Sequence, residues 1–405
     1  MSALAATSIL TGPSVAEPFS TAPCALHRTE AHHSEGVDTW NRAYVRPVGS
    51  LDAVLIFLSF PDATPRTTPD ELTADHFPAT SRFFQQASYG RFTLRPHPLR
   101  RWLRMPKPST AYAMKRDWSE PDRAAYLHDA FAVADREVDF SRFRVVYLVA
   151  DPDAPGVDSD ATKVVNLDTP AHLDGTDVRR VVTVFERHPP DRLVLAHETG
   201  HVFDLPDLYH RPGEDGEGDW DTHVGDWDLM GSQFGLSPDL FAWHKWKLGW
   251  LDPRQVQCVR GTRATRLTLE PLAAGPGVPV RGTAGAPAFG LGGGTKLALV
   301  RTGPDSVLAV EARGSAGNDR TACKQGILVY RVRDDIESGD GPVQVIDAHP
   351  RSRACWENSV YPPLADAPLA LGESVTVPDD GVKVEAEGRT ASGAWTVKIT
   401  PGVAG

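Results

Sequence analysis

The chain has 405 residues, of which 41% are hydrophobic and 23% are charged, so it can bury more than one sizeable core. The formal net charge is −11 and no long basic run occurs, which excludes the electrostatic signature of a nucleic-acid-binding protein. No stretch is long and apolar enough to span a bilayer, so we expect no integral membrane segment. The length favours two domains, and we expect a monomer.

The N-terminal 50 residues are irregular after a short apolar start. Residues 1–16 are small and apolar, and Ser14-Val15-Ala16 resembles a signal-peptidase cleavage site. No Lys or Arg precedes Arg28, whereas a secretory signal begins with basic residues. We therefore expect residues 1–50 to be an arm that holds a weak or truncated signal, or a propeptide remnant, of a secreted protein.

Apolar runs alternate with helix-like segments between residues 51 and 254. Continuous runs of strand formers predict buried strands at residues 52–60, 143–150 and 180–186. Amphipathic patterns predict helices at residues 70–87, 121–138 and 239–248, with a strand that begins at residue 92. This alternation favours an α/β or α+β domain.

The pattern of predicted secondary structure changes beyond residue 255. Short alternating strands, separated by Gly, Pro and Asp, are predicted at residues 264–270, 296–301, 306–312, 326–332, 381–387 and 393–399. This pattern is typical of an all-β sandwich, so we expect residues 255–405 to form a β-rich C-terminal domain.

Four cysteines allow three pairings. We expect Cys323 to pair with Cys355, because both lie in one β-rich segment, and Cys24 then to pair with Cys258. A disulfide is the expected use of Cys24 in a secreted chain, in preference to a thiolate that blocks a zinc ion in a latent form.

One short motif has the residue types and spacing of a metal-binding site. Residues 197–201 read His-Glu-Thr-Gly-His, in a helix predicted to begin after a capping Asp191. Positions i and i+4 share one face of a helix, so His197 and His201 can bind the same zinc ion. Glu198 lies between them, where it can act as the general base for a zinc-activated water.

A catalytic zinc ion needs a third protein ligand and one open position. Asp207 follows His197 by ten residues and is the expected third ligand, with the imidazole of His210 as the alternative. The chain must turn back near residue 204, and Pro206 fits the end of the helix. Asp204 stands at that turn, and Asp is one of the few residues besides glycine that adopts a positive φ.

These residues and their surroundings resemble the immune inhibitor A-like metalloproteases of bacteria, which are zincins of the metzincin kind. The resemblance covers residues 50–250 well and extends more loosely to 308–313. The family usually has glycine where this chain has Asp204. The matching segments are His197–His201 with Leu205–Tyr209, Gly225–Gly231, Ala242–Trp250, and Ala87–Gly90 after Phe83-Phe84.

The resemblance implies a fold and an activity. It implies an α+β chain whose zincin-like catalytic domain, residues 51–254, has a mixed sheet and an active-site helix and precedes a C-terminal β-sandwich-like domain. It implies a secreted zinc-dependent endopeptidase that hydrolyses proteins or peptides. In that family the segment of Met230 turns beneath the zinc ligands and packs there without coordinating the metal.

Two further features concern the substrate. Tyr209 or His223 is expected to support the reaction, as a hydrogen-bond donor near the metal. The strand at residues 180–186 is expected to be the sheet edge that aligns an extended peptide by strand addition.

Two other functions compete with the protease. One is a non-catalytic secreted binding or adhesion protein with a structural zinc site, but such a site needs no general base and fills four positions with protein ligands. The other is a zinc hydrolase that acts on non-peptide bonds, which the motif alone does not separate from a peptidase.

Clustered carboxylates predict calcium as a second metal, because calcium favours oxygen-rich loops. The spacing matches no EF-hand, and the resemblance favours calcium over a solvated surface loop. Residues 151–160 are a second calcium candidate. The carboxylates of the first candidate, residues 214–228, are Glu214, Asp215, Glu217, Asp219, Asp221, Asp226 and Asp228.

Overall fold

The computed structural model describes residues 23–187, 189–191, 193–212, 218–236, 239–275 and 292–402. Two expectations therefore lie wholly or partly outside the described residues: the signal-like segment 1–16, and the calcium candidate through its residues Glu214, Asp215 and Glu217. None of the helices in the described ranges is long and apolar enough to cross a membrane.

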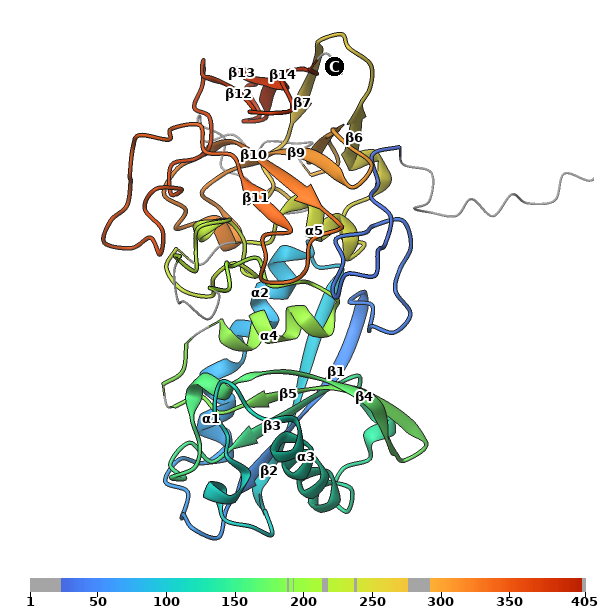
Figure 1. The fold of residues 1–405 in the computed structure, drawn as a ribbon, viewed down its shortest axis with the longest axis vertical. Coiled ribbons are helices and arrows are strands. Elements are labelled where there is room, and N and C mark those ends of the chain that lie inside the picture. The colour runs from blue at the N-terminus through green and yellow to red at the C-terminus, as the bar shows by residue number, and fades with distance from the viewer. Residues whose placement is uncertain are drawn as a thin grey trace, which may run out of the picture.

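A five-stranded mixed sheet forms the first half of the fold, at the bottom of Figure 1. Its first four strands in spatial order pair in parallel and the last is an antiparallel edge strand. With its helices this sheet makes the chain α+β, as predicted. The order is β2 (Phe92–Arg104), β1 (Gly49–Ser59), β3 (Val145–Ala150), β5 (Thr176–Val184) and β4 (Lys163–Leu173).

Helices cover both faces of this sheet because successive strand residues point to opposite sides. On β1, Ile56 and Leu58 join a core with α3 (Glu120–Ala134) on one face. Leu55 and Phe57 join a second core on the other face, which carries α4 (Val194–Val202). Figure 1 shows α3 and α4 on opposite sides of the sheet.

The helix expected at residues 70–87 is two helices, α1 (Pro69–His76) and α2 (Ala79–Ala87). Thr68 and Glu71 form a capping box that begins α1. Pro78 separates the two helices, since proline lacks the N–H that a helix interior needs. The sequence pattern had missed this break.

Two sheets of the C-terminal region pack face to face, which agrees with the predicted sandwich-like arrangement. Their shared core includes Val300, Val310, Val384 and Val397. The first sheet has the order β11 (Val343–Val345), β10 (Gly326–Arg333), β9 (Ser306–Arg313), β8 (Leu297–Arg301) and β6 (Val256–Val259). The second has the order β12 (Ser374–Thr376), β13 (Lys383–Arg389), β14 (Trp395–Thr400) and β7 (Thr265–Leu269).

The first of these sheets is also buried on its other face. Ala309, Leu328 and Tyr330 belong to the same core as the sheet-facing side of α4. The ring of Tyr330 stacks on Phe241, whose centroid is 4.3 Å away, just before α5 (Ala242–Lys247). One apolar core thus joins the two halves, and the domain division at residues 50 and 254 stays a prediction.

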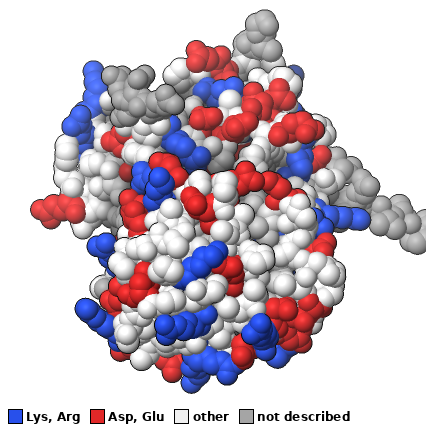
Figure 2. Space-filling view, turned by 60° about the horizontal axis from the view of Figure 1, so that its bottom comes forward, with Lys and Arg blue, Asp and Glu red and all other residues white. Residues whose placement is uncertain are grey.

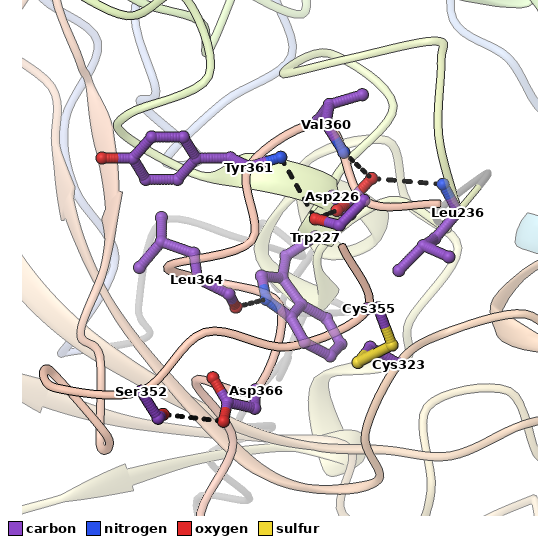
Figure 3. Close-up of a disulfide and its surroundings, with 11 residues drawn as sticks. Asp226, Trp227, Leu236, Cys323, Ser352, Cys355, Val360, Tyr361, Leu364 and Asp366 are labelled. Atoms are coloured by element: carbon purple, nitrogen blue, oxygen red, sulfur yellow. Dashed lines mark hydrogen bonds between the residues drawn. A yellow bond between two sulfur atoms is a disulfide. The ribbon is translucent and has the colours of Figure 1, made fainter. Parts of the chain in front are cut away.

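Both predicted disulfides are present, Cys323–Cys355 and Cys24–Cys258. Figure 3 shows Cys323–Cys355 beside Trp227, whose indole donates to the carbonyl of Leu364 at 2.7 Å. Cys24–Cys258 fastens the N-terminal arm, residues 23–48, to β6. Two disulfides are compatible with an extracellular protein.

Candidate metal centre

Helix α4 carries the His-Glu-Thr-Gly-His motif, and all nine of its residues are buried. The hydroxyls of Thr199 and Tyr147 share a hydrogen bond of 2.8 Å, which fixes the helix to β3 of the sheet below. The N-cap is Leu193, without a side-chain bond, so the expected capping role of Asp191 is wrong. The backbone carbonyl of Asp191 accepts from the N–H of Val194 at 3.3 Å.

Three side chains converge on one point above the helix. Nε2 of His197 and Nε2 of His201 lie 3.3 Å and 3.0 Å from Oδ1 of Asp207. Within the described ranges, this is the one group of three or more His, Cys, Asp or Glu residues whose ligand atoms lie within 4.8 Å of one another. The structure therefore brings together the three residues that the sequence singled out as ligands.

Backbone carbonyls fix the orientation of both imidazoles. Nδ1 of His197 lies 2.9 Å from the carbonyl oxygen of Leu229, and Nδ1 of His201 lies 2.8 Å from that of Leu205. A carbonyl only accepts, so each Nδ1 carries a proton, and Nε2 of each ring is the nitrogen that faces the common point and is available to a metal.

This donor set fits zinc. Ligand nitrogens and oxygens lie about 2.0–2.1 Å from zinc, so two tetrahedral ligand atoms are about 3.3 Å apart, close to the separations found here. Burial opposes the charge on Asp207, but the two histidines outweigh it and hold the pKa of that carboxyl well below its usual range. Asp207 is therefore the anion that a metal ligand must be.

Asp204 occupies the turn that brings Asp207 back over the helix, and its φ is +68°, as the sequence predicted. Its side chain is 1% exposed and accepts from Nη1 of Arg28 at 2.7 Å, while Nζ of Lys247 donates to its backbone carbonyl at 2.6 Å. The carboxylate thus joins the turn to the N-terminal arm, a contact that glycine would not make.

Met230 packs against the active-site helix at Gly200. A Cβ on Gly200 would be 2.5 Å from the Met230 sulfur, so the two segments are in close contact. The carbonyl of Met230 accepts from the N–H of Leu208 at 2.9 Å, which ties this segment to the one that carries Asp207.

Glu198 is 8% exposed and lies at the wall of the cleft that contains the ligands. Its Oε2 accepts from the N–H of Val164 on β4 at 2.7 Å. Burial, as the largest influence, raises the pKa of Glu198.

The contact with Val164 makes β4 the strand beside the centre. The expected edge role of residues 180–186 is wrong, because β5 pairs with β3 on one side and with β4 on the other.

The cleft has a volume of about 1070 Å³ and is bordered by β4, the N-terminal arm and the C-terminal region. Tyr209 lines it, with its ring parallel to that of His197 at 6.3 Å. Trp220 and Phe234, which are 40% and 48% exposed, add apolar surface. The face shown in Figure 2 has acidic and basic side chains interspersed.

Two other candidates lie away from the ligands. The ring of His210 packs against that of His223, at 5.3 Å between centroids, and neither residue lines the cleft. The geometry therefore favours Asp207 over His210, and Tyr209 over His223.

In the calcium candidate, Asp226 accepts from the N–H groups of Leu236 and Val360, visible in Figure 3. Calcium binding stays a prediction.

Sequence reasoning missed several residues of this centre. Nη2 of Arg211 donates to Oδ2 of Asp207 at 2.9 Å, and Ser338 contacts the same residue from the C-terminal region. His32 and His33 of the arm line the cleft. Arg211 follows Asp207 by four residues, which is a weak local signal in the sequence. The sequence around Ser338, His32 and His33 gives no such signal.

No protein-family model matches the chain, and no curated protein matches it. Among solved structures, the chain is similar to OgpA from Akkermansia muciniphila, with 11% sequence identity and a TM-score of 0.28. The alignment covers 89% of this chain and 97% of that chain. A likeness at this TM-score supports no argument about fold or function.

Proposed function

We propose that the chain is a secreted, zincin-like, zinc-dependent endopeptidase in which His197, His201 and Asp207 hold the metal and Glu198 is the general base. The observation that carries the proposal is the convergence of two imidazole nitrogens and one carboxylate oxygen in an open cleft. The mixed sheet beneath the helix and the resemblance to immune inhibitor A-like metalloproteases support it.

The site has the composition of a catalytic zinc centre. Such centres have three protein ligands and one open position, whereas structural centres fill four positions with protein ligands. Three ligand residues converge here, beside a carboxylate that is not among them. These features support the enzyme over a non-catalytic binding protein with a structural zinc ion.

When bound, zinc supplies a Lewis acid that polarises a carbonyl and makes water acidic near neutral pH. Glu198 supplies the proton transfer. The Val164 N–H holds its Oε2, and its Oε1 is the atom that accepts a proton from water and later delivers it to the leaving amine. The raised pKa of Glu198 strengthens it as a base and makes its acid form accessible for the second transfer.

The edge strand β4 suits a peptide substrate. Lys163, Val164 and Asn166 of this strand line the cleft, and among the described strands β4 pairs with β5 alone. An extended peptide can align along such an edge by strand addition, with its scissile bond near Glu198. This favours peptide bonds over other substrates of zinc hydrolases.

The test compares wild type with Glu198→Gln for zinc content and for cleavage of unfolded casein. The isosteric change removes the base without removing a ligand, so we expect one zinc ion in both proteins and a loss of at least 100-fold in cleavage rate. Glu357→Gln, an exposed residue of the C-terminal region, is the matched control and should cleave as wild type does.

Wild type that binds zinc but cleaves no protein would contradict the proposed activity. Equal cleavage by wild type and Glu198→Gln would contradict the role of Glu198.

A further inference from the structure

The carboxylate of Asp207 uses its two oxygens differently. Oδ1 faces Nε2 of both histidines, whereas Oδ2 points to Arg211 and to the hydroxyl of Ser338. A carboxylate whose second oxygen is held in this way presents a single oxygen to the metal point. The groups that hold Oδ2 therefore decide how Asp207 is aimed.

Ser338 reaches Asp207 from the other half of the chain. It lies on the connection between β10 and β11, residues 334–342, and is 131 residues away from Asp207 in sequence. Its Oγ accepts from the N–H of Asp207 at 2.8 Å, and its hydroxyl donates to Oδ2 of Asp207 at 3.4 Å. One hydroxyl thus contacts both the backbone and the side chain of the ligand.

The backbone of the connection reinforces this contact. The N–H of Gly339 donates to the carbonyl of Asp207 at 3.0 Å, and the N–H of Arg211 donates to the carbonyl of Gly339 at 2.8 Å. His210 and Asp340 form the adjoining antiparallel bridge. The segment after the active-site helix is therefore held as a short ladder against the C-terminal region.

The same connection also holds the N-terminal arm. The backbone carbonyl of Asp334 accepts from the hydroxyls of Thr29 and Ser34. Ser34 in turn offers its own carbonyl to Lys247, which also binds the carbonyl of Asp204. Residues 334–342 thus contact Asp207 directly and are linked to Asp204 through Ser34 and Lys247.

We propose that Ser338 is a positioning residue for the zinc ligand Asp207, and that the C-terminal region is thereby part of the metal centre. The inference rests on the proposed function, since it concerns the same zinc site. Hydrogen-bonding partners of metal ligands commonly change metal affinity by about 10–100-fold when they are removed. The loss of zinc affinity on removal of the Ser338 hydroxyl is expected at the lower end of this range, because Arg211 also holds Oδ2 of Asp207.

The test uses the full-length protein stripped of metal and measures zinc affinity by competition with a chromophoric chelator. Ser338→Val is compared with Ser338→Thr, which has the same shape but keeps the hydroxyl. We expect Ser338→Val to bind zinc at least about 10-fold more weakly than wild type and Ser338→Thr to remain within about 3-fold. The absorption bands of bound Co²⁺ should shift in the Val variant alone.

Ser352→Ala is the matched control. Ser352 also donates to an aspartate in the C-terminal region, Asp366, as Figure 3 shows, and its loss should leave zinc affinity unchanged. Equal zinc affinity and equal Co²⁺ spectra for the Val and Thr variants would overturn this inference and leave the proposed function intact. Wild type without zinc affinity would overturn the proposed function itself.

Discussion

Met230 packs so closely against Gly200 that a Cβ on Gly200 would lie 2.5 Å from the Met230 sulfur. Gly200 directly precedes His201, a proposed zinc ligand, and Met230 is fully buried. The distance between the active-site helix and the segment beneath it therefore depends on a residue without a side chain at position 200.

Gly200→Ala is expected to lower the free energy of unfolding by about 1–3 kcal/mol, the usual cost of overpacking a core. Zinc affinity should fall as well, because the added methyl group displaces the helix turn that carries His201. Urea unfolding and chelator competition measure the two effects.

A double-mutant cycle tests the cause. Met230→Ala removes the atoms that the new methyl group would meet, so Gly200→Ala should cost less in that background than in wild type. An equal cost in both backgrounds would show that Met230 and Gly200 do not interact in this way.

Asp204→Gly is expected to destabilise the protein by about 3–5 kcal/mol, although glycine adopts a φ of +68° more readily than aspartate. The loss arises because Arg28 and Lys247 keep their charges while their buried partner is removed. Thermal and urea unfolding measure it.

Asp379→Gly is the matched control, since Asp379 also has a φ of +68° but is exposed. This change should be neutral or slightly stabilising. A stable Asp204→Gly protein would mean that the arm contacts contribute little.

His244 gives the stability a defined pH dependence. Burial favours its neutral ring, but Glu35 and Asp228 outweigh burial and raise the pKa of His244 to about 10. The pKa is thus higher in the folded than in the unfolded protein, where it is about 6.5. Its contribution to stability is full below pH 6.5 and is lost as the pH rises toward 10.

The free energy of unfolding of wild type is therefore expected to fall between pH 6.5 and 10, more steeply than that of His244→Gln. Urea titrations at several pH values measure the slopes. His27→Gln, the same substitution at an exposed histidine, is the control. Parallel curves for wild type and His244→Gln would contradict a buried imidazolium.

The two disulfides should differ in their effect on stability. Cys24–Cys258 closes a loop of 234 residues and Cys323–Cys355 a loop of 32. By loop-closure entropy, replacing the first pair with alanines should cost about 2 kcal/mol more than replacing the second. Equal midpoints of unfolding for the two double variants would point to enthalpic effects instead.

Local patterns were sufficient to predict that the three side chains of the proposed metal centre lie together. The spacing of His197 and His201 is set by the helical repeat, and Asp207 follows after one tight turn, so all three lie in a single short segment. The sandwich-like C-terminal region was also predictable, because period-two alternation shows directly in the sequence.

Contacts between distant segments left no such pattern. Strand β4 was missed because Lys163–Leu173 lacks a clear alternation and contains Pro170, although it forms the edge next to Glu198. Ser338 lies 131 residues from Asp207 in sequence and contacts it only in the packed tertiary structure. Tertiary packing, which no local window contains, decided both.

The most direct test of the account is anomalous diffraction at the zinc absorption edge from crystals of the wild-type protein. We predict one peak that lies about 2.0–2.1 Å from Nε2 of His197, Nε2 of His201 and Oδ1 of Asp207, with a non-protein atom in the fourth position. A zinc ion bound by His210 in place of Asp207, or by four protein ligands, would contradict it.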